Sequence, residues 1–182
     1  MVSLADRERD DRELVRLANR GDPAGLEGLF RAHGEWVAAL ATRFVGDPDD
    51  ALDVMQEVFA YLFERFPGFE LTSTMRAYLY PVVRHQSISL VRKRRKVVEI
   101  DRGSRPPAEL TFWPDDPGDL SRLLDGIDEE TAELLLMRFA LGMKLREIGE
   151  ALGVPTGTVK SRLHNAITEL RRRHGCAQDR LR

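Results

Sequence analysis

The sequence is poor in the residues that build cross-links and cofactor sites. It has a single cysteine, Cys176, so no intramolecular disulfide can form, and this cysteine usage is typical of a reducing compartment. It has four histidines, no metal-ligand spacing and no glycine-rich phosphate loop. We therefore expect neither an enzyme nor a protein that holds a metal or an organic cofactor.

Long hydrophobic runs are missing as well. The first fifteen residues are mostly charged, and no apolar stretch reaches the length of a signal peptide or of a membrane span. This favours a cytoplasmic protein without membrane insertion.

The chain also lacks a large net charge, but its charges are unevenly distributed. The formal net charge is −2, yet residues 84–96 carry six basic side chains and no acidic one. Residues 160–182 carry seven basic side chains against two acidic ones, whereas residues 97–119 carry two arginines against six acids. Two basic segments on either side of an acidic one require an explanation in terms of partners.

Apolar residues recur with helical spacing, and no β alternation is present, so the fold class is expected to be all-α. Helices are predicted from about residue 10, over 23–45, from residue 48 to 66, and over 74–96 with a kink or break at Pro81. Asp47 and Pro48 suit the cap and first position of the third helix. Three or four short helices should follow over residues 120–174.

Residues 97–119 contain four prolines and no sustained period, which indicates a linker. The sequence therefore predicts two small helical domains, residues 1–96 and 120–182, on a flexible, acidic, proline-rich linker over 97–119.

The segment "LREIGEALGVPTGTVKSRLHNA" fits a helix-turn-helix. Gly149 is small where the two helices must cross closely, and Gly153 lies at the turn, where glycine adopts a left-handed conformation most easily. Val159 and Leu163 should anchor the second helix in the core. Thr156 or Thr158 could cap that helix.

The second helix should present a polar face to the DNA major groove. Asparagine can pair bidentately with adenine, and lysine can reach the acceptors of guanine. Arg162 is suited to a phosphate, and residues 171–173, three arginines, would add non-specific attraction. The alternative is an ordinary surface helix whose last turn is basic because of the helix dipole. The candidate DNA-binding residues here are Thr156, Thr158, Lys160, Ser161, Arg162, His164 and Asn165.

The third predicted helix carries an acidic stripe on the side away from its apolar residues. Asp53, Glu57 and Glu64 follow a helical spacing, with Gln56 beside them. Such a stripe can dock a basic partner helix, and the alternative is a solvated face.

The fourth predicted helix combines aromatic and basic residues. Tyr78 and Tyr80 could stack on unpaired bases, and a set of cations could follow a phosphate backbone. The alternatives are core tyrosines and a solvated basic helix end. These cations are Arg84, Arg92, Lys93, Arg94, Arg95 and Lys96.

Together, "GMKLREIGEALGVPTGTVKSRLHNAITELRRR" and "GDPDDALDVMQEVFAYLFERF" closely resemble bacterial RNA polymerase sigma factors of the extracytoplasmic-function type. The resemblance implies that the first domain binds core polymerase and melts the −10 promoter element, and that the second reads the −35 element. It implies core RNA polymerase, through its β′ coiled coil and β flap, and promoter DNA as partners. An anti-sigma factor is a further candidate partner.

The departures from this family concern promoter choice. The family usually has Asn and Asp four residues apart where this chain has His85 and Ser89, which we include among the −10 candidates. Tyr78 replaces a usual tryptophan, Pro81 occupies a normally polar helical position, and Asn165 stands where arginine is common. We therefore expect unusual −10 and −35 preferences.

A stand-alone helix-turn-helix regulator is the alternative function. It would need a dimerisation surface or a ligand pocket, and the sequence has no spare domain for either. A single short recognition helix binds weakly, so presentation of two DNA-binding domains by a polymerase makes physical sense.

Overall fold

The computed structural model describes residues 4–102 and 127–175, with the side chains of residues 10–94 and 127–173. The chain divides into two compact units, Met1–Thr111 (unit 1) and Phe112–Arg182 (unit 2). The described residues form helices and no strand, which confirms the all-α class. The predicted linker lies largely outside the described residues.

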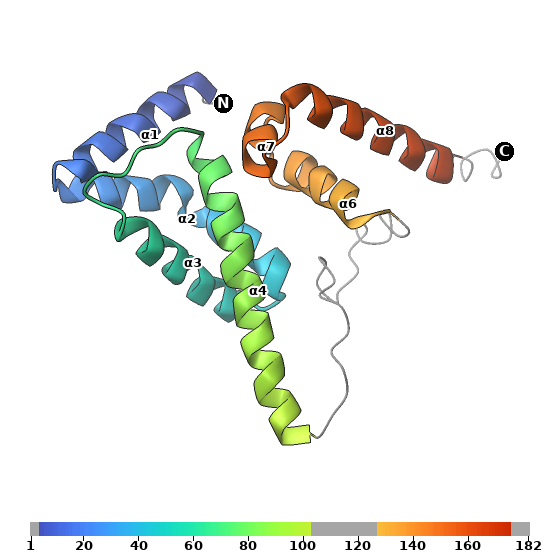
Figure 1. The fold of residues 1–182 in the computed structure, drawn as a ribbon, viewed down its shortest axis with the longest axis horizontal. Helices are drawn as coiled ribbons and strands as arrows, with labels where there is room; N and C mark the ends of the chain where they lie inside the picture. Colours follow the sequence, from blue (N-terminus) through green and yellow to red (C-terminus); the bar gives the residue numbers. More distant parts are fainter. Residues whose placement is uncertain (1–3, 103–126, 176–182) are drawn as a thin grey trace. The chain divides into compact units, whose positions relative to one another are not determined.

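Unit 1 is a four-helix array of α1 (Leu4–Asn19), α2 (Pro23–Val45), α3 (Pro48–Phe63) and α4 (Met75–Arg102). Helices α2 and α3 run in opposite directions, and α4 packs across both (Figure 1). Their inner faces supply an apolar core. Its fully buried members include Leu29, Val37, Leu40, Val58, Leu62, Met75, Leu79 and Val83.

Local signals in the sequence determine where α2 and α3 begin. Asp22 accepts a hydrogen bond from the backbone N–H of Ala24 (2.9 Å) and precedes a proline at the first helical turn. Asp47 accepts from the N–H groups of Asp49 (2.9 Å) and Asp50 (3.0 Å). The predicted starts of both helices and the predicted cap Asp47 are therefore confirmed, and Asp22 is a second cap of the same kind.

Helix α4 is longer than predicted and does not break. It runs through Pro81, so a break there is ruled out, and it continues to Arg102, beyond the expected end at residue 96. Leu79 and Val83, one on each side of the proline, are both fully buried. Their packing stabilises the helix where the proline removes a backbone hydrogen bond, so tertiary contacts override the local signal.

Asn19 joins the end of α1 to the connection between α3 and α4. Its Nδ2 donates to the carbonyl oxygen of Phe69 (2.9 Å), and its Oδ1 accepts from the N–H groups of Gly68 (2.7 Å) and Phe69 (3.0 Å). One side chain thus satisfies three backbone groups of an otherwise irregular segment and ties that segment to α1.

A buried polar contact also links α1 to α2. His33 Nε2 lies 2.7 Å from Asp11 Oδ1, and the two residues are 1% and 4% exposed. The helices also approach closely at Gly25, where an added Cβ would lie only 2.3 Å from the backbone nitrogen of Ala18. Only glycine fits this crossing.

Unit 2 contains α6 (Glu129–Leu135), the π-helical turn η1 (Leu136–Ala140), α7 (Leu145–Leu152) and α8 (Thr156–Gly175). Helix α6 lies beside α8 (Figure 1). The helices enclose a second apolar core. It includes Leu134, Leu136, Met137, Met143, Ile148, Val159 and Leu163.

Asp128 caps α6, and its removal should destabilise unit 2 in a pH-dependent way. Its Oδ1 accepts from the N–H of Thr131 (2.9 Å), and this backbone hydrogen bond lowers the pKa of the Asp128 carboxyl. We expect Asp128→Ala to lower the opening free energy of α6 by about 1 kcal/mol at neutral pH.

The stabilisation by Asp128 should disappear in acid. Because the pKa is lower in the folded state, the cap contributes fully above the ordinary aspartate pKa of about 3.9 and is lost as the pH falls below it, through the folded-state pKa. Hydrogen exchange of the α6 amides at several pH values measures this. A difference between variant and wild type that stays constant into strong acid would contradict the assignment.

Candidate nucleic-acid and polymerase interfaces

The turn between α7 and α8 has the geometry of a helix-turn-helix. An added Cβ on Gly149 would lie 2.8 Å from the carbonyl oxygen of Val154, so α7 and the turn meet at a distance that only glycine allows. Gly153 has φ +66°, in the left-handed region. Both glycine predictions are confirmed, and together they fix the start of α8.

Helix α8 separates an apolar face from a polar one. Val159, Leu163 and Ala166 are buried against α6 and α7, as predicted for the first two. The helix begins at Thr156, after Pro155, so the prediction that Thr156 or Thr158 is the cap residue is wrong. Thr158 is partly buried, whereas the other candidate DNA-binding residues are exposed: Thr156, Lys160, Ser161, Arg162, His164 and Asn165.

Several arginines of α8 are held by carboxylates. Arg162 Nη1 lies 3.2 Å from Glu130 Oε2 of α6. Arg172 donates to both oxygens of Glu169 (2.7 and 2.8 Å), and Arg173 Nε donates to one of them (2.7 Å). These hydrogen bonds lower the pKa of the Glu169 carboxyl to about 2, so this group is ionised at any pH near neutrality.

Sequence reasoning did not single out either carboxylate. Glu169 is three and four residues before its arginines, a helical spacing that could have revealed the pairing. Glu130 lies 32 residues from Arg162, and no local pattern predicts that contact.

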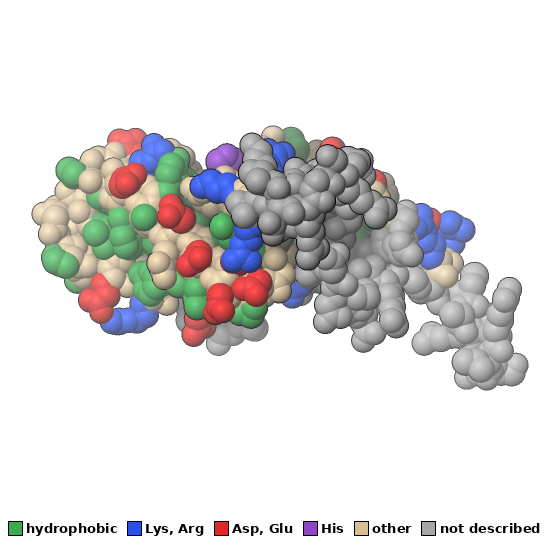
Figure 2. All heavy atoms as spheres, turned by 90° about the horizontal axis from the view of Figure 1, so that it is seen from below, with side chains coloured by type: hydrophobic (Ala, Val, Ile, Leu, Met, Phe, Trp, Pro, Cys, Tyr) green, Lys and Arg blue, Asp and Glu red, His purple; other side chains and the backbone are tan. Residues whose placement is uncertain are grey.

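The acidic stripe of α3 is exposed, as expected for a docking surface. Asp53, Gln56, Glu57 and Glu64 all face away from the unit 1 core. Figure 2 shows acidic side chains spread across this unit, with basic ones beside them. All four residues are accessible, and their contact with a polymerase remains a prediction.

Asp50, at the start of α3, is a residue whose contact the sequence did not reveal. It is 3% exposed and forms an ion pair with Arg94 of α4. Arg94 was expected to follow a phosphate backbone, but here its guanidinium binds a carboxylate of its own unit. The pair joins the first turn of α3 to the basic part of α4.

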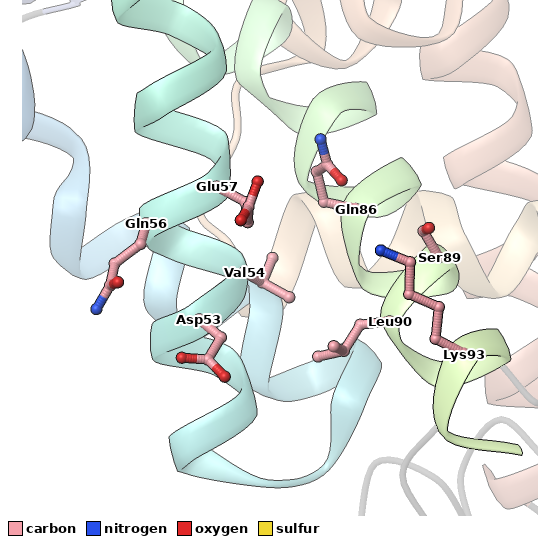
Figure 3. A pocket seen from close by; sticks show the side chains of 8 residues that line it. All are labelled: Asp53, Val54, Gln56, Glu57, Gln86, Ser89, Leu90 and Lys93. Atoms are coloured by element: carbon pink, nitrogen blue, oxygen red, sulfur yellow. The ribbon is translucent and has the colours of Figure 1, made fainter. Parts of the chain in front are cut away.

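A groove of about 260 Å³ separates α3 from α4 (Figure 3). Val54 and Leu90 supply its apolar lining, and Glu57 and Lys93 point toward it from opposite walls. Ser89 lies beside Lys93. The groove therefore brings residues predicted for −10 DNA next to residues predicted for the polymerase. Asp53, Gln56 and Gln86 complete its lining.

The two tyrosines of α4 have different environments. Tyr80 is 1% exposed, and its ring lies 6.4 Å from that of Phe44 in an edge-to-face arrangement. The prediction that it stacks on bases is therefore wrong, because its ring is part of the core. Tyr78 is half-buried, with its ring edge-on to Phe69 at 5.0 Å, and burial raises the pKa of its hydroxyl.

The basic candidates on α4 are not equally accessible. His85, Arg92 and Lys93 are exposed, whereas Arg84 and Ser89 are partly buried. The side chains of Arg95 and Lys96 lie outside the described ones. The accessible cations are thus concentrated toward the C-terminal half of the helix.

Exposed apolar side chains form a feature that the sequence did not indicate. Phe139 is 61% exposed on η1, and Phe30 and Leu52 of unit 1 are 42% and 47% exposed. An exposed phenylalanine cannot be distinguished from a core one by periodicity over a short π-helical turn.

Two further findings concern the described part of the chain. It contains no group of three or more His, Cys, Asp or Glu side chains placed to hold a metal ion. None of its helices is both long enough and apolar enough to cross a membrane.

The geometry defines a helical protein whose second unit carries a helix-turn-helix. Residues 29–97 match the family described as Sigma-70 region 2, and residues 118–170 match Sigma-70, region 4. The chain belongs to the sigma-70 family of RNA polymerase sigma factors, in its extracytoplasmic-function group.

Individual relatives agree with this assignment. The chain is 29% identical over 163 residues to the ECF RNA polymerase sigma factor SigE of Mycolicibacterium smegmatis, covering 83% of this chain but 63% of that relative. It is 22% identical to the ECF sigma factor SigW of Bacillus subtilis, covering 87% of this chain and 93% of that one.

A solved structure shares the fold. The sigma factor RpoE of Bartonella quintana, in complex with the anti-sigma factor NepR, has a TM-score of 0.56 and 22% identity, covering 82% of this chain and 96% of that one.

Proposed function

We propose that the protein is a promoter-specificity subunit of RNA polymerase, which directs the core enzyme to −10 and −35 elements at the start of transcription. One observation carries this proposal: a single chain contains a region 2 unit with an exposed acidic stripe, followed by a region 4 unit with an exposed helix-turn-helix. The protein itself performs no chemistry, and it acts in the cytoplasm, where the polymerase and the DNA are.

In the second unit, the exposed face of α8 reads the −35 element. Lys160, His164 and Asn165 reach base edges in the major groove, because their side chains are exposed opposite the buried Val159 and Leu163. Thr156, Thr158 and Ser161 lie near the start of the same helix, where hydroxyl groups can bind the DNA backbone.

In the first unit, the acidic stripe of α3 binds the β′ coiled coil, since exposed carboxylates on one helical face complement a basic partner. Tyr78 remains the candidate for stacking on an unpaired base, with Arg84, Arg92, Lys93 and Arg95 along the phosphates. His85 and Ser89 contribute to the −10 preference. The β flap and an anti-sigma protein are further partners, the latter supported by the relative bound to NepR.

The decisive experiment is transcription from a library of random promoters by bacterial core polymerase, with and without the protein. Start sites that appear only with the protein and share two motifs at a fixed spacing would establish the function. DNA binding without any new start site would instead identify a stand-alone helix-turn-helix regulator. If neither activity were found with several core polymerases, the proposal would be wrong.

Two substitutions on α8 should have different effects on DNA. Asn165→Ala should change the preference at one position of the −35 element by about 1–3 kcal/mol, because an asparagine–adenine pair is lost. Arg171→Ala, on the exposed end of the same helix, should weaken binding to all sequences and reduce the salt slope by about one. Binding to a −35 library at several salt concentrations measures both. Equal losses across all sequences for both variants would contradict the assignment of Asn165 to base reading.

A further inference from the structure

Arginines suited to phosphate are paired with carboxylates in both units of the free protein. Arg94 of unit 1 is bound by Asp50, which is buried. In unit 2, Arg162 is bound by Glu130, and Glu169 holds two arginines at the end of α8. The basic surface available to DNA is therefore smaller than the number of basic residues suggests.

The contacts of Glu169 resemble those of a phosphate group. Its two oxygens accept two hydrogen bonds from Arg172, at 2.7 and 2.8 Å, which is the bidentate geometry that guanidinium groups adopt with phosphate. One of these oxygens also accepts from Nε of Arg173 at 2.7 Å. The carboxylate thus occupies the donors that a DNA phosphate would use.

The contact of Glu130 acts between two helices. Glu130 belongs to the first turn of α6 and is largely exposed, and Arg162 lies on the flank of α8 beside the DNA-reading face. Both side chains can rearrange without disturbing the core, because neither is buried.

We propose that Glu130 and Glu169 act as internal substitutes for phosphate, which hold arginines of α8 and so weaken the binding of the free protein to non-promoter DNA. This inference rests on the proposed function in DNA binding. Non-specific affinity depends on how many phosphates the protein neutralises, and an arginine that must first leave a carboxylate contributes less to it.

These ion pairs are weak enough for DNA to displace them reversibly. Exposed ion pairs are weak, so each corresponds to roughly a two- to fivefold effect on affinity. A DNA segment held in place by base contacts and by polymerase can displace the carboxylates, whereas a non-promoter segment gains little beyond the phosphate contacts themselves.

The test measures binding of the full chain to random-sequence duplex DNA by fluorescence anisotropy over a range of salt. Glu169→Gln and Glu130→Gln should each raise the affinity roughly two- to fivefold. Glu169→Asp should also raise it, because the shorter side chain keeps the charge but cannot reach both arginines. The matched control is Glu27→Gln, which changes the charge equally and breaks an exposed pair with Arg31 on α2; it should leave affinity unchanged.

Two results would overturn the inference. If Glu169→Asp bound like the wild type while both Glu169→Gln and Glu27→Gln bound more tightly, only net charge would matter. If none of the α8 variants bound more tightly, the pairs would have no effect on DNA. NMR gives a second readout, because the Nε–H groups of Arg172 and Arg173 donate to Glu169. Their resonances should shift in Glu169→Asp as these hydrogen bonds are lost, even if the helix frays slightly.

The proposed function and this inference fail in different ways. If the wild type directs transcription from promoters but the variants bind random DNA equally, only the inference is wrong. If the wild type directs no transcription with core polymerase, the proposed function is wrong, whatever the variants do.

Discussion

Replacing Gly149 with alanine should lower the free energy of unfolding of unit 2 by about 1–3 kcal/mol and remove sequence-specific binding by α8. The added Cβ would lie 2.8 Å from the carbonyl oxygen of Val154, which is backbone and cannot rotate away. The same turn holds a hydrogen bond from the N–H of Val154 to the carbonyl oxygen of Gly149 (2.9 Å). Relief of the clash would therefore displace the start of α8.

The matched control is Gly157→Ala, the same substitution in the first turn of α8. No atom lies within 4 Å of a Cβ added there, and its φ is not in the left-handed region. Alanine should stabilise this position by up to about 1 kcal/mol because it favours the helix over the unfolded chain. Urea unfolding of the full chain, with hydrogen exchange at α8 amides, measures both. Equal stabilities of the two variants would show that α7 and α8 do not meet as closely as described.

Reversing the acidic stripe should reduce affinity for core polymerase roughly a hundredfold, because several like charges would then face each other at the interface. The variant is Asp53→Lys with Glu57→Lys. Both side chains are exposed, and neither takes part in an ion pair within the described residues, so the fold of unit 1 should survive. Competition with labelled wild type for core polymerase gives the affinity, and circular dichroism verifies the helix content.

Glu13→Lys with Glu27→Lys is the control for this variant. It produces the same change in net charge at exposed sites on α1 and α2, where each glutamate forms an ion pair with an arginine of its own helix. Its affinity for polymerase should remain near that of the wild type. If both double variants bound core polymerase equally weakly, the change in net charge would explain the loss. If the stripe variant bound core polymerase like the wild type, the stripe would be a solvated surface.

The elements that the sequence predicts well are those with local determinants. Asp22 and Asp47, each followed by proline, mark the starts of α2 and α3 by hydrogen bonds within three residues. Gly149 and Gly153 predict the helix-turn-helix for two local reasons. Gly149 must be small because the backbone of the turn lies close to it, and Gly153 must adopt a left-handed conformation. The exposed faces of α3 and α8 follow in turn from helical periodicity.

Features that depend on distant partners could not be predicted in this way. Tyr78 and Tyr80 are only two residues apart, and which ring enters the core is decided by Phe44 and Phe69 from other segments. Pro81 lies in an unbroken helix because the flanking residues are anchored in the core. Arg94 and Arg162 appeared to be free cations, since their partners come from helices far away in sequence.

The groove between α3 and α4 has a consequence for how such a protein can diverge from its relatives. Glu57 and Ser89 belong to opposite walls of one hollow, so a substitution on either wall alters the shape and charge that the other wall experiences. A substitution at Ser89, a predicted −10 residue, would therefore also alter the surroundings of Glu57 in the acidic stripe. If Ser89 reads the −10 element and Glu57 binds the polymerase, as proposed, promoter choice and affinity for the polymerase change together. Compensating substitutions should then accumulate across the groove.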